Sequence, residues 1–139
     1  MNLTIVHTKR FLGGVIGLEA EKLEFIAEKV AEWVENVKKF ANAAKHSPQA
    51  AYAAFTKSLQ LEWSFVQRVV ATDEDIYAPL WEVIRSAFIP AVIGQETREE
   101  GLFTLPARLG GLGIQNPLLS RESAFHTSRE AVDVFWCKP

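Results

Sequence analysis

The spacing of apolar residues predicts a first long helix over residues 19 to 45. Apolar side chains recur there at intervals of three or four, which places them on one helical face, while the opposite face is charged. Six acids fall within residues 19 to 35 and three lysines follow, an order that opposes the helix dipole. The predicted buried stripe is Leu23, Ile26, Val30, Trp33, Val34, Val37 and Ala41.

A second helix is predicted to begin at Pro48. Ser47 can cap free amides there, and proline tolerates the first helical position because no intrahelical donor is needed. Alanines in the first turns permit a close neighbour, so we expect an antiparallel pair with the first helix. The predicted inward side chains are Tyr52, Phe55, Leu59, Trp63, Val66 and Val69.

A third helix is expected after residues 72–75 (TDED), which supply a cap and first-turn acids. Pro90 should kink or end this helix, and Gly94 should finish it. A short helical turn is expected near residues 97–103. The predicted apolar stripe of the third helix is Ile76, Leu80, Val83, Ile84 and Phe88.

The segment 105–117 (LPARLGGLGIQNP) predicts an ordered loop. It holds three glycines and two prolines, which favour special backbone angles, and its apolar residues argue against a linker. Asn116 and Pro117 repeat the order of a cap followed by proline. They predict a last helix, whose expected buried side chains are Phe125, Val132 and Phe135.

The first eighteen residues predict a short β-hairpin. Apolar segments at 3–6 and 11–16 flank polar residues 7–10, a pattern typical of two brief strands and a turn. An isolated hairpin is marginal in water, so this one should need a neighbour. The expected fold class is mainly α, a helical bundle of four to five helices with a short N-terminal β-hairpin. Residues 1–139 are expected to form a single domain, with the hairpin in 1–18 and the helical region in 19–139.

The composition permits one globular domain and excludes some classes of protein. The 139 residues are 48% hydrophobic and include four Trp, which is enough for one core. The single cysteine, Cys137, excludes an internal disulfide and a cysteine-cluster zinc site. The pattern predicts no apolar run of the roughly 18 residues that span a bilayer and no signal peptide. We therefore expect a soluble, intracellular protein without a membrane partner.

No constellation of side chains in the sequence predicts catalysis or metal binding. The three histidines lack a metal-ligand spacing, which favours surface or capping roles, and the acids of the first helix are typical of a solvated face. Three serines lie near a histidine, but neither an oriented base nor an oxyanion site is visible. We predict no catalytic residue, no metal site and no cofactor. The residues considered are His7, His46, His126, Glu28, Glu32, Glu35, Ser120, Ser123 and Ser128.

Basic residues concentrate in one segment although the formal net charge is -2. Residues 38–68 hold five Lys or Arg and one acid, Glu62, with His46, Tyr52 and Trp63 interleaved. Such a segment can lie along a phosphate backbone, because point charges supply affinity and aromatic rings can stack. A solvated helix-hairpin surface explains it equally well. If nucleic acid is bound, these bases should gather on one exposed surface beside the hairpin.

Two motifs, in order, resemble those of a polymerase family. Residues 10–16 (RFLGGVI) resemble the aromatic-Leu-Gly turn of the primer grip in reverse transcriptases. Residues 105–117 are similar to the Leu-Pro, Gly-Gly-Leu-Gly-Ile segment that follows the thumb in many retrotransposon polymerases. Shorter matches lie between them in the order seen in retroelement-like open reading frames, so the resemblance covers nearly the whole chain. These matches are Glu32-Trp33, residues 48–52 (PQAAY), Trp63, Gln67-Arg68 and residues 88–91 (FIPA).

The resemblance implies a primer-grip and thumb region that holds an RNA–DNA or DNA duplex by its backbone, without reading sequence. It implies a grip turn of Phe11, Leu12 and Gly13 beside the primer end, with Lys9 and Arg10 facing the phosphates. The other duplex contacts that it implies are Lys38, Lys39, Lys45, Lys57, Arg68 and Arg108.

The catalytic centre of that family is missing from this sequence. The family uses an aromatic-x-Asp-Asp turn and a further aspartate to hold two metal ions, and no Asp-Asp pair occurs here. The resemblance therefore implies a non-catalytic fragment, a degenerate remnant or a domesticated copy. Palm and fingers would lie upstream, and Mg²⁺ would serve only the parent RNA-directed DNA polymerase. The alternative is a helical protein-interaction module or small homo-oligomer that binds no nucleic acid.

Overall fold

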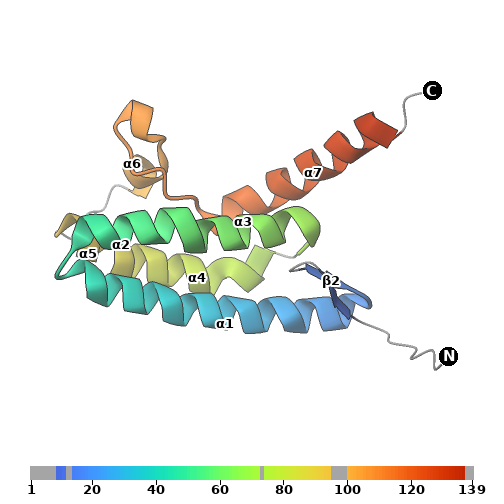
Figure 1. The fold of residues 1–139 in the computed structure, drawn as a ribbon, viewed down its shortest axis with the longest axis horizontal. Coiled ribbons are helices and arrows are strands. Elements are labelled where there is room, and N and C mark those ends of the chain that lie inside the picture. The colour runs from blue at the N-terminus through green and yellow to red at the C-terminus, as the bar shows by residue number, and fades with distance from the viewer. Residues whose placement is uncertain (1–8, 12–13, 73, 95–99, 137–139) are drawn as a thin grey trace.

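The computed structural model describes residues 9–11, 14–72, 74–94 and 100–136, and the chain is mainly helical (Figure 1). Three long helical runs pack together, and a smaller C-terminal part lies against the second run. The first run is the helix α1, Glu19–Ala44. The second run consists of α2 (Pro48–Ala54), the π-helical turn η1 (Phe55–Leu59) and α3 (Gln60–Val69).

The third run is built in the same way, with a π-helical turn in its middle. It consists of the 3-10 turn η2 (Glu74–Tyr77), α4 (Ala78–Val83), the π-helical turn η3 (Ile84–Phe88) and α5 (Ile89–Ile93). The C-terminal part consists of α6 (Glu100–Thr104), the 3-10 turn η4 (Ala107–Leu109) and α7 (Pro117–Trp136).

The predicted antiparallel pairing of the first two runs is confirmed. α1 and α2 are joined by a short turn and lie side by side with opposite directions (Figure 1). The second run begins at Pro48, as expected, but the side chain of Ser47 makes no capping hydrogen bond. Pro48 has no amide hydrogen, so the first helical position leaves no donor without a partner.

The ends of the third run follow from two residues. Gly94 ends α5 in the left-handed conformation, with φ of 72°, and its amide donates to Pro90 O at 2.8 Å. Pro90 does not end the helix; instead, the wide turn η3 comes immediately before α5. Because a proline ring collides with the carbonyl four residues earlier in an α-helix, a wider turn at that point accommodates it.

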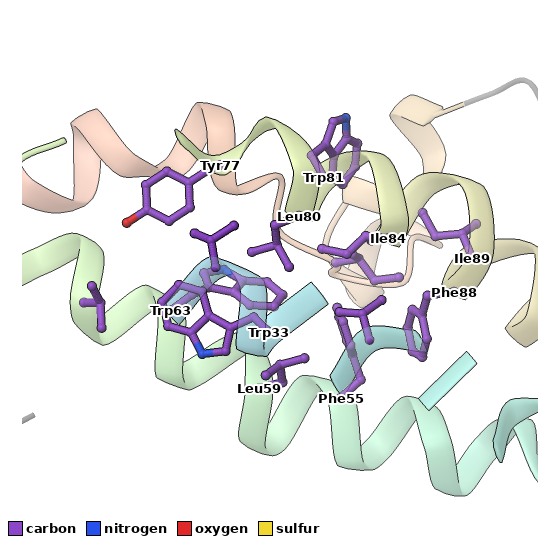
Figure 2. Close-up of a cluster of buried hydrophobic side chains, with 14 of the residues drawn as sticks. Trp33, Phe55, Leu59, Trp63, Tyr77, Leu80, Trp81, Ile84, Phe88 and Ile89 are labelled. Carbon is purple, nitrogen blue, oxygen red and sulfur yellow. The ribbon is translucent and has the colours of Figure 1, made fainter. Parts of the chain in front are cut away.

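A cluster of large buried side chains joins the three runs (Figure 2). Trp33 from α1 and Trp63 from α3 are fully buried, and Leu80 and Ile84 of the third run pack into the same cluster. Phe55, at the start of η1, stacks on Phe88, at the end of η3, with ring centroids 4.1 Å apart. The two π-helical turns therefore meet in the core.

Four predicted core residues are exposed. Leu23 is 37% exposed in the second turn of α1, and Val69 is 46% exposed, while its neighbour Val70 is buried instead. Val70 follows the buried Trp63 by seven residues and therefore shares its face, whereas Val69 lies to one side of that face. Val132 and Phe135 are 53% and 84% exposed because the C-terminal end of α7 extends beyond the bundle (Figure 1).

The two short strands at the N-terminus are β1 (Lys9–Phe11) and β2 (Gly14–Ile16), and they pair antiparallel with Lys9 opposite Ile16. The expected strand at 3–6 lies outside the described residues, so the hairpin of residues 1–18 stays a prediction. Lys9 and Arg10, expected in the polar turn, lie in β1 instead. Polar residues are compatible with a two-stranded ribbon, because one of its faces can meet water.

The segment Asp75–Ile93 is long and apolar enough, by length and composition, to cross a membrane. This corrects the expectation that no such run exists, since few charges interrupt the segment. One third of the apolar window lies buried inside the bundle. The same segment supplies core side chains, namely Tyr77, Leu80, Trp81, Ile84, Phe88 and Ile89.

Candidate nucleic-acid interface

The glycine-rich loop, residues 105–117, is bound to the second helical run by side chains spaced along that run. Gln60 Nε2 donates to Gly113 O at 3.1 Å, and Gln60 Oε1 accepts from the amide of Gln115 at 3.1 Å. One turn earlier than η1, the hydroxyl of Tyr52 donates to Leu112 O. The side-chain amide of Gln60 thus both donates to and accepts from the loop backbone, as a neighbouring backbone would. The loop is therefore held in an ordered conformation against the second run.

Gln67 continues this row of contacts at the start of α7. Its Nε2 donates to Pro117 O at 2.8 Å, and its Oε1 accepts from Ser120 Oγ at 2.8 Å. The residue is 1% exposed, and Gln60 is 8% exposed. Residues seven apart are two helical turns apart and share a face. The two glutamines therefore hold the loop and α7 to the same side of α3, the loop-bearing side.

The conformation of the loop depends on its glycines. Gly110 and Gly113 have φ of 84° and 62°, which side chains rarely adopt, so the predicted special backbone angles are confirmed. Gly111 is required for a different reason: a Cβ there would lie 2.0 Å from Leu105 O. The amide of Gly113 also donates to Leu105 O at 2.8 Å. The loop therefore folds tightly back on its own first residue.

The start of α7 is capped as the sequence predicts. Asn116 Oδ1 accepts from the amide of Leu118 at 2.9 Å, next to Pro117. One turn into the helix, Arg121 Nη1 donates to Thr72 O at 2.8 Å and ties α7 to the segment after α3. Ser123 Oγ donates to Ser120 O at 3.1 Å, a structural contact that accounts for this serine near His126.

The role of Gln60 is not predicted from the sequence, because the inward side chains expected on the second run are apolar and a buried amide does not belong to such a stripe. A signal was present, because Gln60 and Gln67 are polar residues two turns apart beside that stripe. Buried amides of this kind need partners, and a loop rich in glycine has the exposed backbone groups that supply them.

Two of the three lysines expected along α1, Lys38 and Lys45, lie at hollows that the loop does not line. Lys38 follows Val34 by one turn, and Val34 lines a cleft between α1 and the start of the third run. Lys45 lies beside α5, where it lines a shallow hollow with Pro90. Lys39 is also exposed on α1. Lys38 is neutralised by Glu35, whose Oε1 lies 2.8 Å from Lys38 Nζ.

Lys57 and Arg68 lie on the second run, and both are exposed. Lys57 is three residues before Gln60, and Arg68 follows Ser64 by one turn. Ser64 Oγ donates to Gln115 Oε1 of the loop at 2.8 Å, so both bases border the loop-bearing side. Arg108, in the turn η4 of the loop, is exposed as well. The predicted single basic surface is thus divided between α1 and the loop-bearing side.

The remaining predicted contacts are at the N-terminus. Lys9, Arg10 and Phe11 form β1, and their side chains are not described. Leu12 and Gly13, the expected grip turn, lie outside the described residues. The duplex contact expected at this turn stays a prediction.

The acids of the chain are distributed unequally between these sides. Residues 48–61, 63–72 and 101–121 contain no Asp or Glu, and these segments form the second run, the loop and the start of α7. Residues 19–35 of α1 contain six acids. Apart from Glu62, these segments bring bases and no acids to the loop-bearing side, which is the electrostatic condition for a phosphate backbone.

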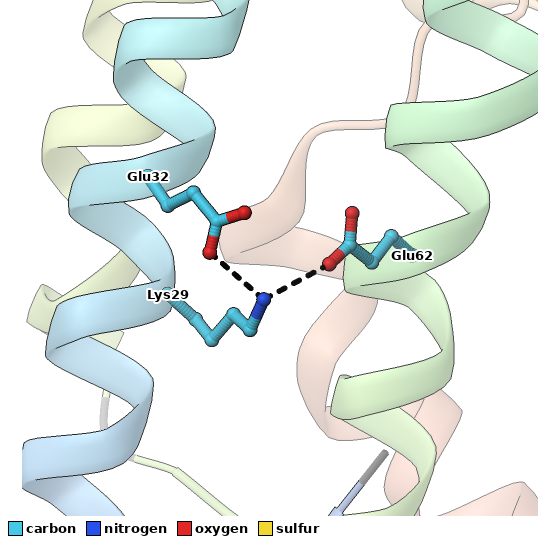
Figure 3. Close-up of polar contacts among 3 residues, drawn as sticks. All are labelled: Lys29, Glu32 and Glu62. Atoms are coloured by element: carbon cyan, nitrogen blue, oxygen red, sulfur yellow. Dashed lines mark hydrogen bonds and ion pairs between the residues drawn. The ribbon is translucent and has the colours of Figure 1, made fainter.

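Glu62, the only acid among residues 38–68, points toward Lys29 of α1 (Figure 3). Lys29 Nζ of α1 lies 2.8 Å from Glu32 Oε2 and 3.3 Å from Glu62 Oε1. The hydrogen bond to Glu32 and the contacts with Glu62 raise the pKa of Lys29 above its ordinary value of 10.5, against the effect of burial. The ion pair links α1 to α3 and holds the negative charge between them.

The described residues contain no cluster of three or more His, Cys, Asp or Glu that could hold a metal ion. Tyr77 is fully buried in the core, and this burial raises the pKa of its hydroxyl. No protein-family model, curated protein or solved structure matches the chain. The functional inference therefore depends on the geometry above and on the motif resemblance.

Proposed function

We propose that this chain is a non-catalytic, thumb-like region of a retroelement reverse transcriptase. In this role it holds an RNA–DNA or DNA duplex by its backbone, independently of sequence. The duplex lies on the loop-bearing side, where Lys57, Arg68 and Arg108 contact phosphates. The catalytic palm and fingers, with their Mg²⁺, belong to the parent polymerase.

The observation that supports this proposal is the absence of acids from the segments that build the loop-bearing side. The chain as a whole has a net charge of -2, so a phosphate backbone would be repelled by most of its surface. Lys57, Arg68 and Arg108 are exposed near the loop, and those segments contribute no acid beside them. Glu62 of α3 is paired with Lys29. Phosphate contacts of this kind position a duplex but do not read its bases.

The motifs that resemble the polymerase family support the proposal independently. Tyr52 and Gln67, which belong to two of the shorter matches, donate to the loop that forms the longest match. Trp63, a third match, is fully buried beside them. Motifs that are separated along the sequence thus contact one another where the second run meets the loop. These contacts give their order and spacing a physical reason.

The experiment is a titration of the full chain with a fluorescent RNA–DNA duplex at 50 and 200 mM salt. We expect binding that weakens as salt rises, because counterions are released when phosphates are neutralised. The double variant Lys57→Glu/Arg68→Glu should bind more weakly, and its salt slope should fall by about 1 for each lost contact. Equal affinity for an unrelated duplex of the same length would confirm independence of sequence.

The matched control is the double variant Lys38→Glu/Lys39→Glu on α1, which changes the net charge by the same amount. If only total charge matters, both double variants lose affinity equally, and the assignment to the loop-bearing side is wrong. Affinity that is unaffected by salt would contradict nucleic-acid binding altogether.

A second candidate function, a helical protein-interaction module, is favoured by the end of α7. Val132, Val134, Phe135 and Trp136 are all more than half exposed, and the last two are 84% and 83% exposed. Apolar side chains gathered on a protruding helix are typical of protein contacts. Sedimentation of the chain with and without a Phe135→Ser/Trp136→Ser double change tests this candidate, since self-association through α7 would be lost in the variant.

A further inference from the structure

An apolar cleft lies between α1 and the start of the third run, away from the loop-bearing side. It has a volume of about 530 Å³. Apolar residues form most of its lining, namely Ala27, Val30, Ala31, Val34, Ile76 and Pro79. Ala27 and Ala31 are exposed, so solvent reaches the wall that α1 provides. Binding of a partner would remove this apolar surface from water, which favours the complex over the free chain.

The edges of the cleft carry negative charge. Glu35 and Asp75 line it directly from its two sides. Glu28 and Glu24 continue the row of Glu35 along α1, two and three turns earlier, and both are exposed. Two bases lie at this edge against these four acids: Lys38, which is paired with Glu35 at 2.8 Å, and Lys39, whose charge also acts on Glu35. The field at the cleft is therefore acidic, unlike that of the loop-bearing side.

The shape of the cleft fits a helix. Its α1 wall spans residues 27 to 34, which is two helical turns or about 10 Å. Alanines at positions 27 and 31 are one turn apart and allow the close approach of another helix. Its polar atoms do not converge on a point, as they would in a site for a small polar molecule. A helix laid in such a groove inserts apolar side chains spaced by three, four and seven residues.

We propose that this cleft binds a basic amphipathic helix of another protein, with two or three apolar side chains in the cleft and its Lys or Arg against the acidic edges. A second copy of this chain is a poorer occupant. The exposed end of α7 carries Glu130 and Asp133 against one base, Arg129, so it would bring acids against acids. Two copies placed cleft to cleft would also bring the Glu35 and Asp75 carboxylates of one copy against those of the other, which is unfavourable.

The test uses the full chain and a dye-labelled 15-residue peptide of Leu and Lys whose leucines follow helical spacing. Anisotropy should show saturable binding of this peptide, and two control peptides should bind at least tenfold more weakly. One has the same composition in an order without helical periodicity, and the other has Ser in place of every Leu. Equal binding by either control would contradict the proposal, because charge alone would then explain the affinity.

Two protein variants locate the bound peptide. Ala31→Arg places a positive charge in the cleft at an exposed helical position, and we expect it to weaken peptide binding at least tenfold. Ala43→Arg makes the same change at an exposed position of α1 outside the cleft and should leave binding unchanged. Undiminished binding of the peptide to Ala31→Arg would overturn the proposal. The proposal would also be overturned if the original chain formed a stable dimer that Ala31→Arg dissociates, because a second copy would then occupy the cleft.

The outcome is independent of the proposed duplex binding. Lys57→Glu/Arg68→Glu should keep full affinity for the peptide, and Ala31→Arg should keep full affinity for the duplex. A loss of both activities in either variant would indicate that the chain has unfolded, which circular dichroism of the same samples detects.

Discussion

The two sides of this small bundle differ in charge and in how they are built. The side formed by α1, η2 and α4 carries most of the described acids and contains an open apolar cleft. The loop-bearing side of α2 and α3 has a single acid in its helices, Glu62, which is paired with Lys29 of α1, and is covered by an irregular loop held by buried amides. The net charge of -2 is the sum over an acidic side and a side with more bases than acids, so the total does not reveal how the charges are distributed.

The most severe way to break the loop-bearing side is to substitute Gly111. In Gly111→Ala, the new Cβ would meet Leu105 O at 2.0 Å, so the loop must open. We expect a loss of about 2 kcal/mol or more in the free energy of unfolding, measured in urea. Gly101→Ala is the control, because a Cβ there meets nothing within 4 Å and alanine favours the helix α6. Equal stability of the two variants would contradict the described loop.

Gln67→Ala should have the next largest effect on the same side. It leaves Pro117 O and Ser120 Oγ without their partner in a buried place, which costs about 1–3 kcal/mol of unfolding free energy. Gln49→Ala, at an exposed position of α2, should cost much less. If both substitutions cost the same, the contact between Gln67 and α7 does not hold the joint. Duplex affinity should fall with Gln67→Ala as α7 loosens.

A smaller effect is expected at the boundary between the two sides. Glu62→Ala removes the ion pair with Lys29, in which the lysine side chain is 15% exposed and Glu62 is 45% exposed. Partly exposed pairs contribute little, so we expect a loss of less than about 1 kcal/mol in urea unfolding. Duplex affinity should stay equal or rise, since a negative charge disappears. A clear fall in affinity would show that Glu62 has a direct role in binding.

The smallest effect concerns the pH dependence of the acidic side. The hydrogen bond from Lys38, with its positive charge, lowers the pKa of Glu35 below the ordinary value of 4.5. A lowered folded-state pKa contributes stability that is complete above pH 4.5 and disappears as the pH falls through the folded value. Melting curves of Glu35→Gln should therefore approach those of the original chain at low pH. A difference that grows below pH 4 would have the wrong sign.

Much of the helical architecture follows from apolar spacing, and the deviations have local causes. Ile26, Val30, Trp33 and Val37 are buried as predicted, because a regular helix repeats faithfully over several turns. The prediction for Val69 is wrong because Val70, seven residues after the buried Trp63, occupies the inward face instead.

The candidate site was only partly predictable. The ordered loop and the cap at Asn116 follow from glycine, proline and asparagine, whose local preferences are strong. The grouping of bases was not predictable, because segment 38–68 crosses the turn between two antiparallel helices. Lys38 and Lys57 are near in sequence but belong to different helical runs, whereas Arg108 belongs to the loop that Tyr52 and Gln60 hold to the second run.

We propose that nucleic acid lies on the loop-bearing side, and amide NMR spectra of the full chain titrated with an RNA–DNA duplex at low salt test this claim. We predict that the largest shifts occur around Lys57, Arg68 and Arg108, and that residues 24–35 of α1 stay unchanged. Shifts concentrated on α1, or a spectrum that does not change at all, would contradict the claim.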